Sequence, residues 1–209
     1  VWKSDQVYCS SVNDIYVVPS IADIDNDGTP EGVVRNKVFD ASTGKLLCTA
    51  TGGSNVGGSL AHQGNSSYPL RQPVTMPCIA NIDKSDDRLE VILGNEIYKV
   101  YITNHAGTTG NSMPLWKSAT LPSGVNLADG HAQVADFNLD GNLDVFVSNR
   151  YCSTTNYNNG QVSFYVWDVA NNSVSNAMVL NTTVVGKSLP LISNIDGEDN
   201  VPPTPTRAV

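Results

Sequence analysis

Two nine-residue stretches decide how this sequence is interpreted: Asp23-Ile-Asp-Asn-Asp-Gly-Thr-Pro-Glu31 and Asp136-Phe-Asn-Leu-Asp-Gly-Asn-Leu-Asp144. Each stretch carries oxygen-bearing side chains at positions 1, 3, 5 and 9, and glycine at position 6. Calcium binds about six to eight oxygen ligands, and glycine permits the sharp turn that gathers them. The spacing therefore predicts two calcium loops.

Each loop supplies its expected ligands from both side chains and backbone. Position 7 adds a backbone carbonyl in such a loop. The closing acid stands at position 9, whereas an EF-hand places it at position 12 between two helices. The expected ligands are Asp23, Asp25, Asp27, Thr29 and Glu31 in one loop, and Asp136, Asn138, Asp140, Asn142 and Asp144 in the other.

Both loops belong to a longer internal repeat. The segment Val18-Pro-Ser-Ile-Ala-Asp23 has counterparts that end at Asn81, Asp136 and Asn194, so the steps are 58, 55 and 58 residues. Trp2-Lys-Ser4 likewise returns as Trp116-Lys-Ser118. Self-similarity at this period predicts an array of supersecondary units that bury their cores against one another.

Within a period the pattern is all-β. Strand-like segments are expected at 16–22, 32–35, 37–39 and 45–51 in the first period, and at 78–79, 90–93, 97–102 and 115–119 in the second. Four strands in a unit of this length are typical of a β-propeller blade. A parallel β-solenoid is the alternative, although its repeats are usually about half as long. No stretch has a convincing helical period.

Together, the loops and their flanking strands resemble the FG-GAP/VCBS repeats that form the blades of integrin-α-like β-propellers. The resemblance covers nearly the whole chain. It implies the propeller fold, and it implies calcium in the first and third repeats. It leaves the biological role open, because one fold serves many functions.

The second and fourth loops depart from the pattern. The second, 81–90, has one extra residue and no glycine. Its candidate ligands are Asn81, Asp83, Asp87 and Glu90. Lys84 and Arg88 offer an alternative to calcium, by pairing with Asp83, Asp87 or Glu90. The fourth loop, 194–200, lacks a clear closing acid before a proline-rich end.

The charge of the chain is concentrated in the four loops. The sequence has 20 acidic and 12 basic residues, for a net charge of −8, and 14 of the 20 acids fall in these loops. Clustered carboxylates repel one another unless a cation is bound, so the acidity indicates metal sites. No basic patch or motif is present to neutralise phosphates, which argues against a nucleic-acid partner.

The length predicts part of a propeller. At about 57 residues per blade, residues 1–209 make a single segment of about 3.7 blades, whereas closed propellers have about four to eight. We expect a segment of a longer six- to eight-bladed chain. A four-bladed ring closed by the N-terminal segment is the alternative. The four cysteines (9, 48, 78 and 152) allow up to two disulfides, or a free thiol at Cys78.

Calcium and the insertions guide the functional interpretation. No transmembrane span is expected, and structural calcium favours an extracellular or cell-surface location. Insertions at 52–72 and 150–160 are expected on the face opposite the calcium loops, and the second offers a ligand-binding surface formed by Tyr151, Asn156, Tyr157 and Asn158.

The predicted function is a binding or adhesion module for a glycan or protein ligand. The histidines at 62, 105 and 131 are scattered, and no catalytic constellation can be assembled around them. One alternative is a propeller-type polysaccharide lyase or another carbohydrate-active enzyme. Another is an architectural domain that contacts other chains of a surface assembly.

Overall fold

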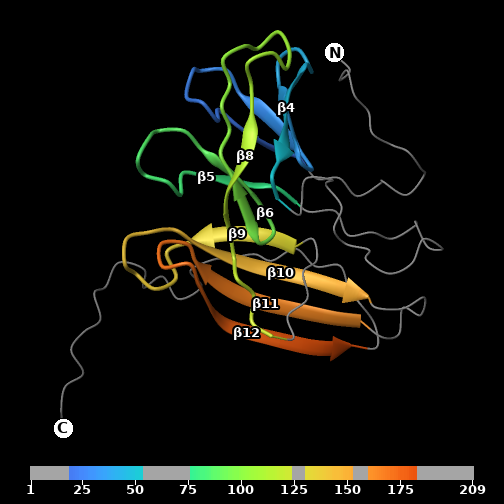
Figure 1. Ribbon diagram of the computed structural model, residues 1–209, viewed down its shortest axis with the longest axis vertical. Helices are drawn as coiled ribbons and strands as arrows, with labels where there is room; N and C mark the ends of the chain where they lie inside the picture. The colour runs from blue at the N-terminus through green and yellow to red at the C-terminus, as the bar shows by residue number, and fades with distance from the viewer. Residues whose placement is uncertain (1–18, 54–75, 124–129, 153–159, 183–209) are drawn as a thin grey trace.

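The computed structural model describes residues 19–53, 76–123, 130–152 and 160–182, which form twelve β-strands and no helix (Figure 1). The prediction of an all-β chain is therefore confirmed for the part that the structure describes. That part likewise contains no helix long and apolar enough to cross a membrane.

The strands form three units of four, and each unit corresponds to one period of the sequence. The first unit comprises β1 (Ser20–Ala22), β2 (Glu31–Val34), β3 (Lys37–Asp40) and β4 (Leu46–Thr51). The second comprises β5 (Cys78–Ala80), β6 (Glu90–Leu93), β7 (Glu96–Tyr98) and β8 (Met113–Ser118). The third comprises β9 (Gly130–Ala135), β10 (Asp144–Cys152), β11 (Gly160–Asp168) and β12 (Ser173–Thr182).

Neighbouring strands within each unit pair antiparallel, in chain order. This pairing contradicts the alternative of a parallel solenoid, in which successive strands would stack in parallel. The last three strands of the third unit are longer than their counterparts in the other two units. β10 continues to Cys152, which pairs with Gly160, so the expected insertion at 150–160 begins and ends as strand.

The turns repeat as well as the strands. A two-residue turn joins β2 to β3 and another joins β6 to β7, and each begins with a left-handed residue, Arg35 (φ 56°) or Gly94 (φ 59°). The carbonyl oxygens of Asn36 and Asn95 each accept a 2.9 Å bond from an amide at or just after the fourth strand. The first two units therefore share their local hydrogen bonding as well as their strand order.

The units join into two sheets. A short parallel contact of β4 with β8, at Ala50–Met113 and Thr51–Pro114, links the first two units into one eight-stranded sheet. The third unit forms a separate four-stranded sheet, seen below the others in Figure 1. The first strands of the units, β1, β5 and β9, come together, since β5 contacts both of the others.

The second unit is buried on both faces. Val91 and Leu93 pack in one apolar cluster with residues of the first unit, among them Leu47. Ile92, on the opposite face of β6, packs in another cluster with Trp167 of the third unit. Side chains alternate between the faces of a strand, so a strand packed on both sides becomes continuously apolar. This packing explains the run Val91–Leu93 and fixes the order of the three units.

The cysteine prediction is settled in part. Cys48 and Cys78 are free thiols, and Cys48 is buried. Burial raises the pKa of the Cys48 thiol to about 12, so it stays protonated and unreactive at neutral pH. Cys9 lies outside the described residues.

A matched pair of methionines tests this packing. Met113 is fully buried between the first two units, whereas Met178 on β12 is 55% exposed. We expect Met113→Ala to lower the free energy of unfolding by about 2–5 kcal/mol, because it leaves a cavity, and Met178→Ala to change it by less than about 0.5 kcal/mol. Chemical denaturation measures both, and equal effects would contradict the described core.

Candidate metal centre

The first and third loops share one backbone conformation. Position 4 is left-handed in both, at Asn26 (φ 61°) and Leu139 (φ 59°), and so is position 6, at Gly28 (φ 92°) and Gly141 (φ 87°). A left-handed leucine is unfavourable by about 1–2 kcal/mol. Leu139 adopts this conformation while 74% exposed, so the loop hydrogen bonds rather than packing impose it.

The first acid of each loop organises the turn. Asp23 accepts bonds from the amides of Asp27 (3.0 Å) and Gly28 (2.9 Å). Asp136 accepts the equivalent bonds from the amides of Asp140 (3.0 Å) and Gly141 (2.8 Å). These carboxylates therefore satisfy amide groups that the tight turn leaves without backbone partners.

The middle acids are held in a similar way. Asp27 accepts a 2.7 Å bond from the amide of Thr29, and Asp140 accepts a 2.8 Å bond from the amide of Asn142. In the third loop the Asn138 side-chain oxygen also accepts from the Asp140 amide, at 2.9 Å. The expected side-chain ligands of each loop thus point into a common turn, and each leaves oxygen lone pairs for a cation.

The closing acid is buried and only half satisfied. Glu31, 0% exposed, accepts a 2.8 Å bond from the Ile24 amide through Oε2, and Asp144, 1% exposed, accepts a 3.0 Å bond from the Phe137 amide through Oδ2. The other oxygen of each, Glu31 Oε1 and Asp144 Oδ1, has no hydrogen-bond partner among the residues that the structure describes. A buried carboxylate oxygen without a partner is costly, which identifies both atoms as candidate metal ligands.

Burial also shifts the acidity of these groups. Loss of solvent, together with repulsion by Asp25 and Asp27, raises the pKa of Glu31 to about 7. Burial raises the pKa of Asp25 and of Asp144 as well. Each of these carboxylates is therefore harder to ionise in the metal-free protein than in water, and a bound cation would reverse that effect.

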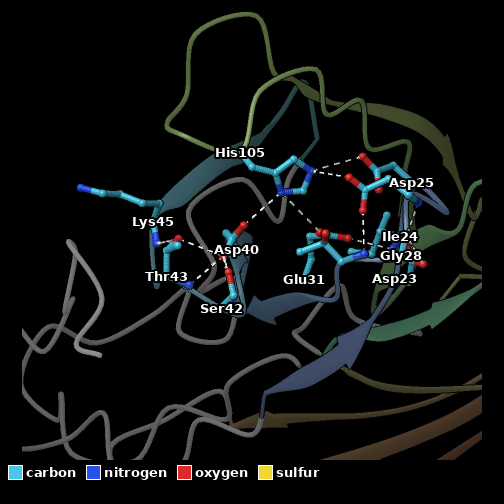
Figure 2. A network of polar contacts seen from close by, with 12 residues as sticks. Asp23, Ile24, Asp25, Gly28, Glu31, Asp40, Ser42, Thr43, Lys45 and His105 are labelled. Carbon is cyan, nitrogen blue, oxygen red and sulfur yellow. Dashed lines mark hydrogen bonds and ion pairs between the residues drawn. The ribbon is translucent and has the colours of Figure 1, made fainter. Parts of the chain in front are cut away.

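The first loop receives a histidine that the sequence pattern did not assign to it. His105 lies in the turn between β7 and β8 of the second unit and reaches across to the first loop (Figure 2). Its Nε2 lies 3.1 Å from Asp27 Oδ2 and 3.7 Å from Asp25 Oδ2. One ligand atom from each of Asp25, Asp27, Glu31 and His105 lies within 4.8 Å of the others, so this cluster can hold a metal ion.

Asp40, at the end of β3, fixes the orientation of that histidine. Asp40 Oδ1 accepts bonds from Ser42 and Thr43, at 2.6 to 2.9 Å, which leaves Oδ2 to contact His105 Nδ1 at 3.1 Å. Burial raises the pKa of Asp40, but these hydrogen bonds outweigh it and hold the pKa well below its usual value. Asp40 therefore stays ionised and accepts the Nδ1 proton of His105.

The second loop has a built-in cation. Lys99, directly after β7, pairs with Asp83 through a short contact and lies 5.1 Å above the Trp116 ring. The hydrogen bond from Lys99 is the largest of the causes that lower the pKa of Asp83. The closing acid Glu90 is held as in the other loops, accepting bonds from the amides of Ile82 (2.9 Å) and Asp83 (3.0 Å).

The predicted pairing of Lys84 and Arg88 with Asp83, Asp87 or Glu90 is wrong. Arg88 pairs with Asp86 at 3.3 Å, and Lys84 donates to the carbonyl of Gly141 in the third loop. The cation beside Asp83 is Lys99 instead. Val91 pairs with Tyr98, so the next residues outward on the two strands, Glu90 and Lys99, face each other. Of the other candidate ligands in this loop, Asn81 donates to the Asp86 carbonyl at 3.2 Å, and Asp87 is exposed.

The fourth loop (194–200) and the candidate ligand-binding residues Asn156, Tyr157 and Asn158 lie outside the described residues. Tyr151 lies within β10, paired with Gln161.

Comparisons with protein-family models, with curated proteins and with solved structures found no match to this chain. The resemblance to FG-GAP/VCBS repeats therefore rests on the motif residues alone and stays a prediction.

Lys99 provides a test of the second loop. Lys99→Met should lower the free energy of unfolding by about 1–2 kcal/mol at pH 7, because it leaves Asp83 and Glu90 without their cation. Lys99→Arg, which keeps the charge, should cost less. Since the pKa of Asp83 is lowered in the folded state, this contribution is present above its usual pKa of 3.8 and disappears as the pH falls. A Lys99→Met variant as stable as wild type at pH 7 would contradict the assignment.

Because the closing acid Glu31 is buried, the stability of the protein in chelator should fall as the pH rises. A raised pKa means that the native state holds the Glu31 proton more tightly, so stability falls as pH rises from about 4.5 to about 7. The loss is on the order of 3 kcal/mol, from about 1.4 kcal/mol per pKa unit. Glu31→Gln removes this titration. In chelator it should therefore be more stable than wild type at pH 7.5 and similar to it at pH 4.5, as measured by denaturant unfolding. A Glu31→Gln protein that is less stable than wild type at both pH values would show that ionisation of Glu31 does not destabilise the fold.

Proposed function

We propose that this chain is a calcium-stabilised β-propeller segment of a secreted or cell-surface protein, and that it acts as a binding or adhesion module for a glycan or protein ligand. The observation that carries the proposal is the repeated loop whose buried closing acid keeps one oxygen without a partner. Oxygen ligands are those that calcium prefers, and such ligands predominate in both loops.

The arrangement of the units supports the propeller. β1, β5 and β9 line one cavity of about 520 Å³, with side chains that include Ser20, Cys78 and His131. In a propeller the first strand of each blade lines the central channel, and successive sheets pack face to face around it. The burial of the second unit on both faces agrees with a blade between two neighbours.

The position of the loops supports a stabilising role for the cation. Each loop joins the first two strands of its unit, and its closing acid is the first residue of the second strand, Glu31 or Asp144. A cation shared by the closing acid and the earlier carboxylates would tie these strands together. Such weak oxygen sites are saturated outside cells, where calcium is abundant, which supports the proposed location.

Strand direction supports a separate ligand-binding face. The third calcium loop precedes β10 at Asp144, and residues 153–159 follow β10 at Cys152, the opposite end of the same nine-residue strand. At about 3.3 Å per residue, the two ends of this strand, Asp144 and Cys152, lie about 25 Å apart. A ligand bound at the 153–159 end would therefore leave the metal loop undisturbed.

The cavity offers little support for the enzymatic alternative. His131 and Cys78 are the ionisable side chains in the described lining. Burial lowers the pKa of His131 and raises that of Cys78, so both are neutral at pH 7. Neutral His131 could still accept a proton, but a lyase also needs a cationic group that stabilises the developing carbanion, and the described lining contains no lysine or arginine.

Thermal unfolding with calcium and with chelator tests the proposal. Calcium should raise the melting temperature of wild type, with a stabilisation of about 2.7 kcal/mol at a hundredfold excess over Kd. Asp140→Ala should reduce that increase while changing the melting temperature in chelator only slightly. Asp87→Ala, in the second loop where Lys99 supplies the cation, should keep the full increase. Identical melting temperatures for wild type with calcium and with chelator would refute a structural role for calcium.

A further inference from the structure

The first loop differs chemically from the third, although their backbones match. Its ligand set includes an imidazole from the next unit, whereas the described surroundings of the third loop provide oxygen ligands and the ammonium of Lys84. Asp168 faces Asp144 across the strands but is engaged by Asn171, at 2.7 and 2.9 Å. The two loops therefore should not prefer the same ion.

Three atoms in the first site are buried without hydrogen-bond partners within the described chain: Glu31 Oε1, Asp25 Oδ1 and His105 Nε2. Glu31 is completely buried, so its free oxygen cannot be satisfied by bulk water. His105 Nε2 lies 3.1 Å from Asp27 Oδ2 but is not aligned for a hydrogen bond with it. A nitrogen lone pair and a carboxylate oxygen repel each other at this distance, so Nε2 and Asp27 Oδ2 require a positive charge near them.

The orientation of His105 is that of a metal-binding histidine. Metal-ligating histidines usually donate the other ring N–H to a carboxylate, which fixes the tautomer and raises the basicity of the ligating nitrogen. Here Asp40 accepts from Nδ1 at 3.1 Å, and Ser42 and Thr43 hold Asp40 in place. This arrangement turns Nε2 toward the acidic loop, as Figure 2 shows, and in the neutral ring with its proton on Nδ1 that nitrogen carries the lone pair.

We propose that the first loop binds a first-row transition-metal dication of the zinc type in preference to calcium, with His105 Nε2 as a ligand beside Asp25, Asp27 and Glu31. The proposal rests on the proposed cation-binding role of the loops and specifies the ion for one of them. Imidazole nitrogen favours zinc and its neighbours, whereas calcium binds oxygen almost exclusively. Because His105 belongs to the second unit, the metal also joins two units.

The competing explanation is that protonated His105 is itself the cation, as Lys99 is in the second loop. Although burial opposes the change, the hydrogen bond to Asp40 and the loop carboxylates raise the pKa of His105, which favours the imidazolium while no metal is bound. The number of charges nevertheless opposes the imidazolium as the complete solution. Lys99 faces Asp83 and Glu90, and Arg88 pairs with the nearby Asp86. One imidazolium in the first site would instead face three carboxylates, besides Asp40 behind it. A dication bound to a neutral imidazole compensates this excess better.

The test uses the intact chain in metal-free buffer, titrated separately with Zn²⁺ and Ca²⁺ by calorimetry. The ¹⁵N chemical shifts of the imidazole groups are followed in parallel. Zn²⁺ should move the Nε2 resonance of His105 and should bind more tightly than Ca²⁺ at this site. His105→Gln should weaken Zn²⁺ binding by more than about 100-fold, and Asp40→Asn by about 10–100-fold as a positioning residue.

A matched variant in the other loop serves as the control. Asp140→Asn should leave Zn²⁺ binding unchanged and weaken Ca²⁺ binding, while His105→Gln should leave Ca²⁺ binding at the third loop within about threefold of wild type. Circular dichroism of each variant verifies folding, and Asp40→Asn supplies an independent readout if His105→Gln does not fold.

Zn²⁺ binding that is equally tight in His105→Gln, or a His105 resonance that Zn²⁺ does not move, would overturn the proposal. So would a His105→Gln protein that is less stable than wild type in metal-free buffer while Zn²⁺ does not bind wild type, since that result identifies the imidazolium as the cation. Calcium stabilisation through Asp140 would still support the proposed function in these cases. Failure of both ions to bind would refute both proposals.

Discussion

The structure depends on one recurring interaction, in which the closing acid of each loop bends back to accept the backbone amide of loop position 2. Glu31 does this with Ile24, Glu90 with Ile82 and Asp144 with Phe137, at 2.8 to 3.0 Å. The bond fixes the loop against the second strand and buries a carboxylate. Burial of a carboxylate is expensive unless a cation accompanies it. Each unit therefore requires a positive charge near its closing acid.

The residue across from the closing acid decides how each unit meets that requirement. In the second unit this residue is Lys99, whose ammonium lies beside Asp83 and lowers its pKa. In the first unit the equivalent residue is Asp40, paired with Glu31 across the strands. It adds negative charge and orients His105 toward the loop. One position in the repeat thus separates a unit that carries its own cation from a unit that needs an external ion.

The sequence predicted the features that local chemistry determines. Residue spacing and glycine at position 6 identified the loops, and Gly28 and Gly141 indeed adopt φ values near 90°. The apolar segments predicted the all-β class and several strands, such as β6 at Glu90–Leu93. These features depend on residues that are close in the chain, so a single sequence reveals them.

The features that the sequence did not predict depend on pairing between distant segments. His105 lies 74 residues beyond Glu31 and reaches the first loop only because the second unit packs against the first. Lys99 follows a strand rather than a loop, and so its role could be found only by aligning β6 with β7. Lys84 and Arg88 were expected to neutralise the second loop because they lie within it, but Lys84 instead donates to the carbonyl of Gly141.

A crystal structure of the protein grown with both calcium and zinc, with anomalous scattering recorded at the zinc edge, tests the central claim most directly. The account predicts zinc bound to His105 Nε2 and the free Glu31 oxygen, calcium bound to the free Asp144 oxygen, and Lys99 beside Asp83 with no metal. Water molecules at the first and third loops, or a metal ion in the second, would contradict it.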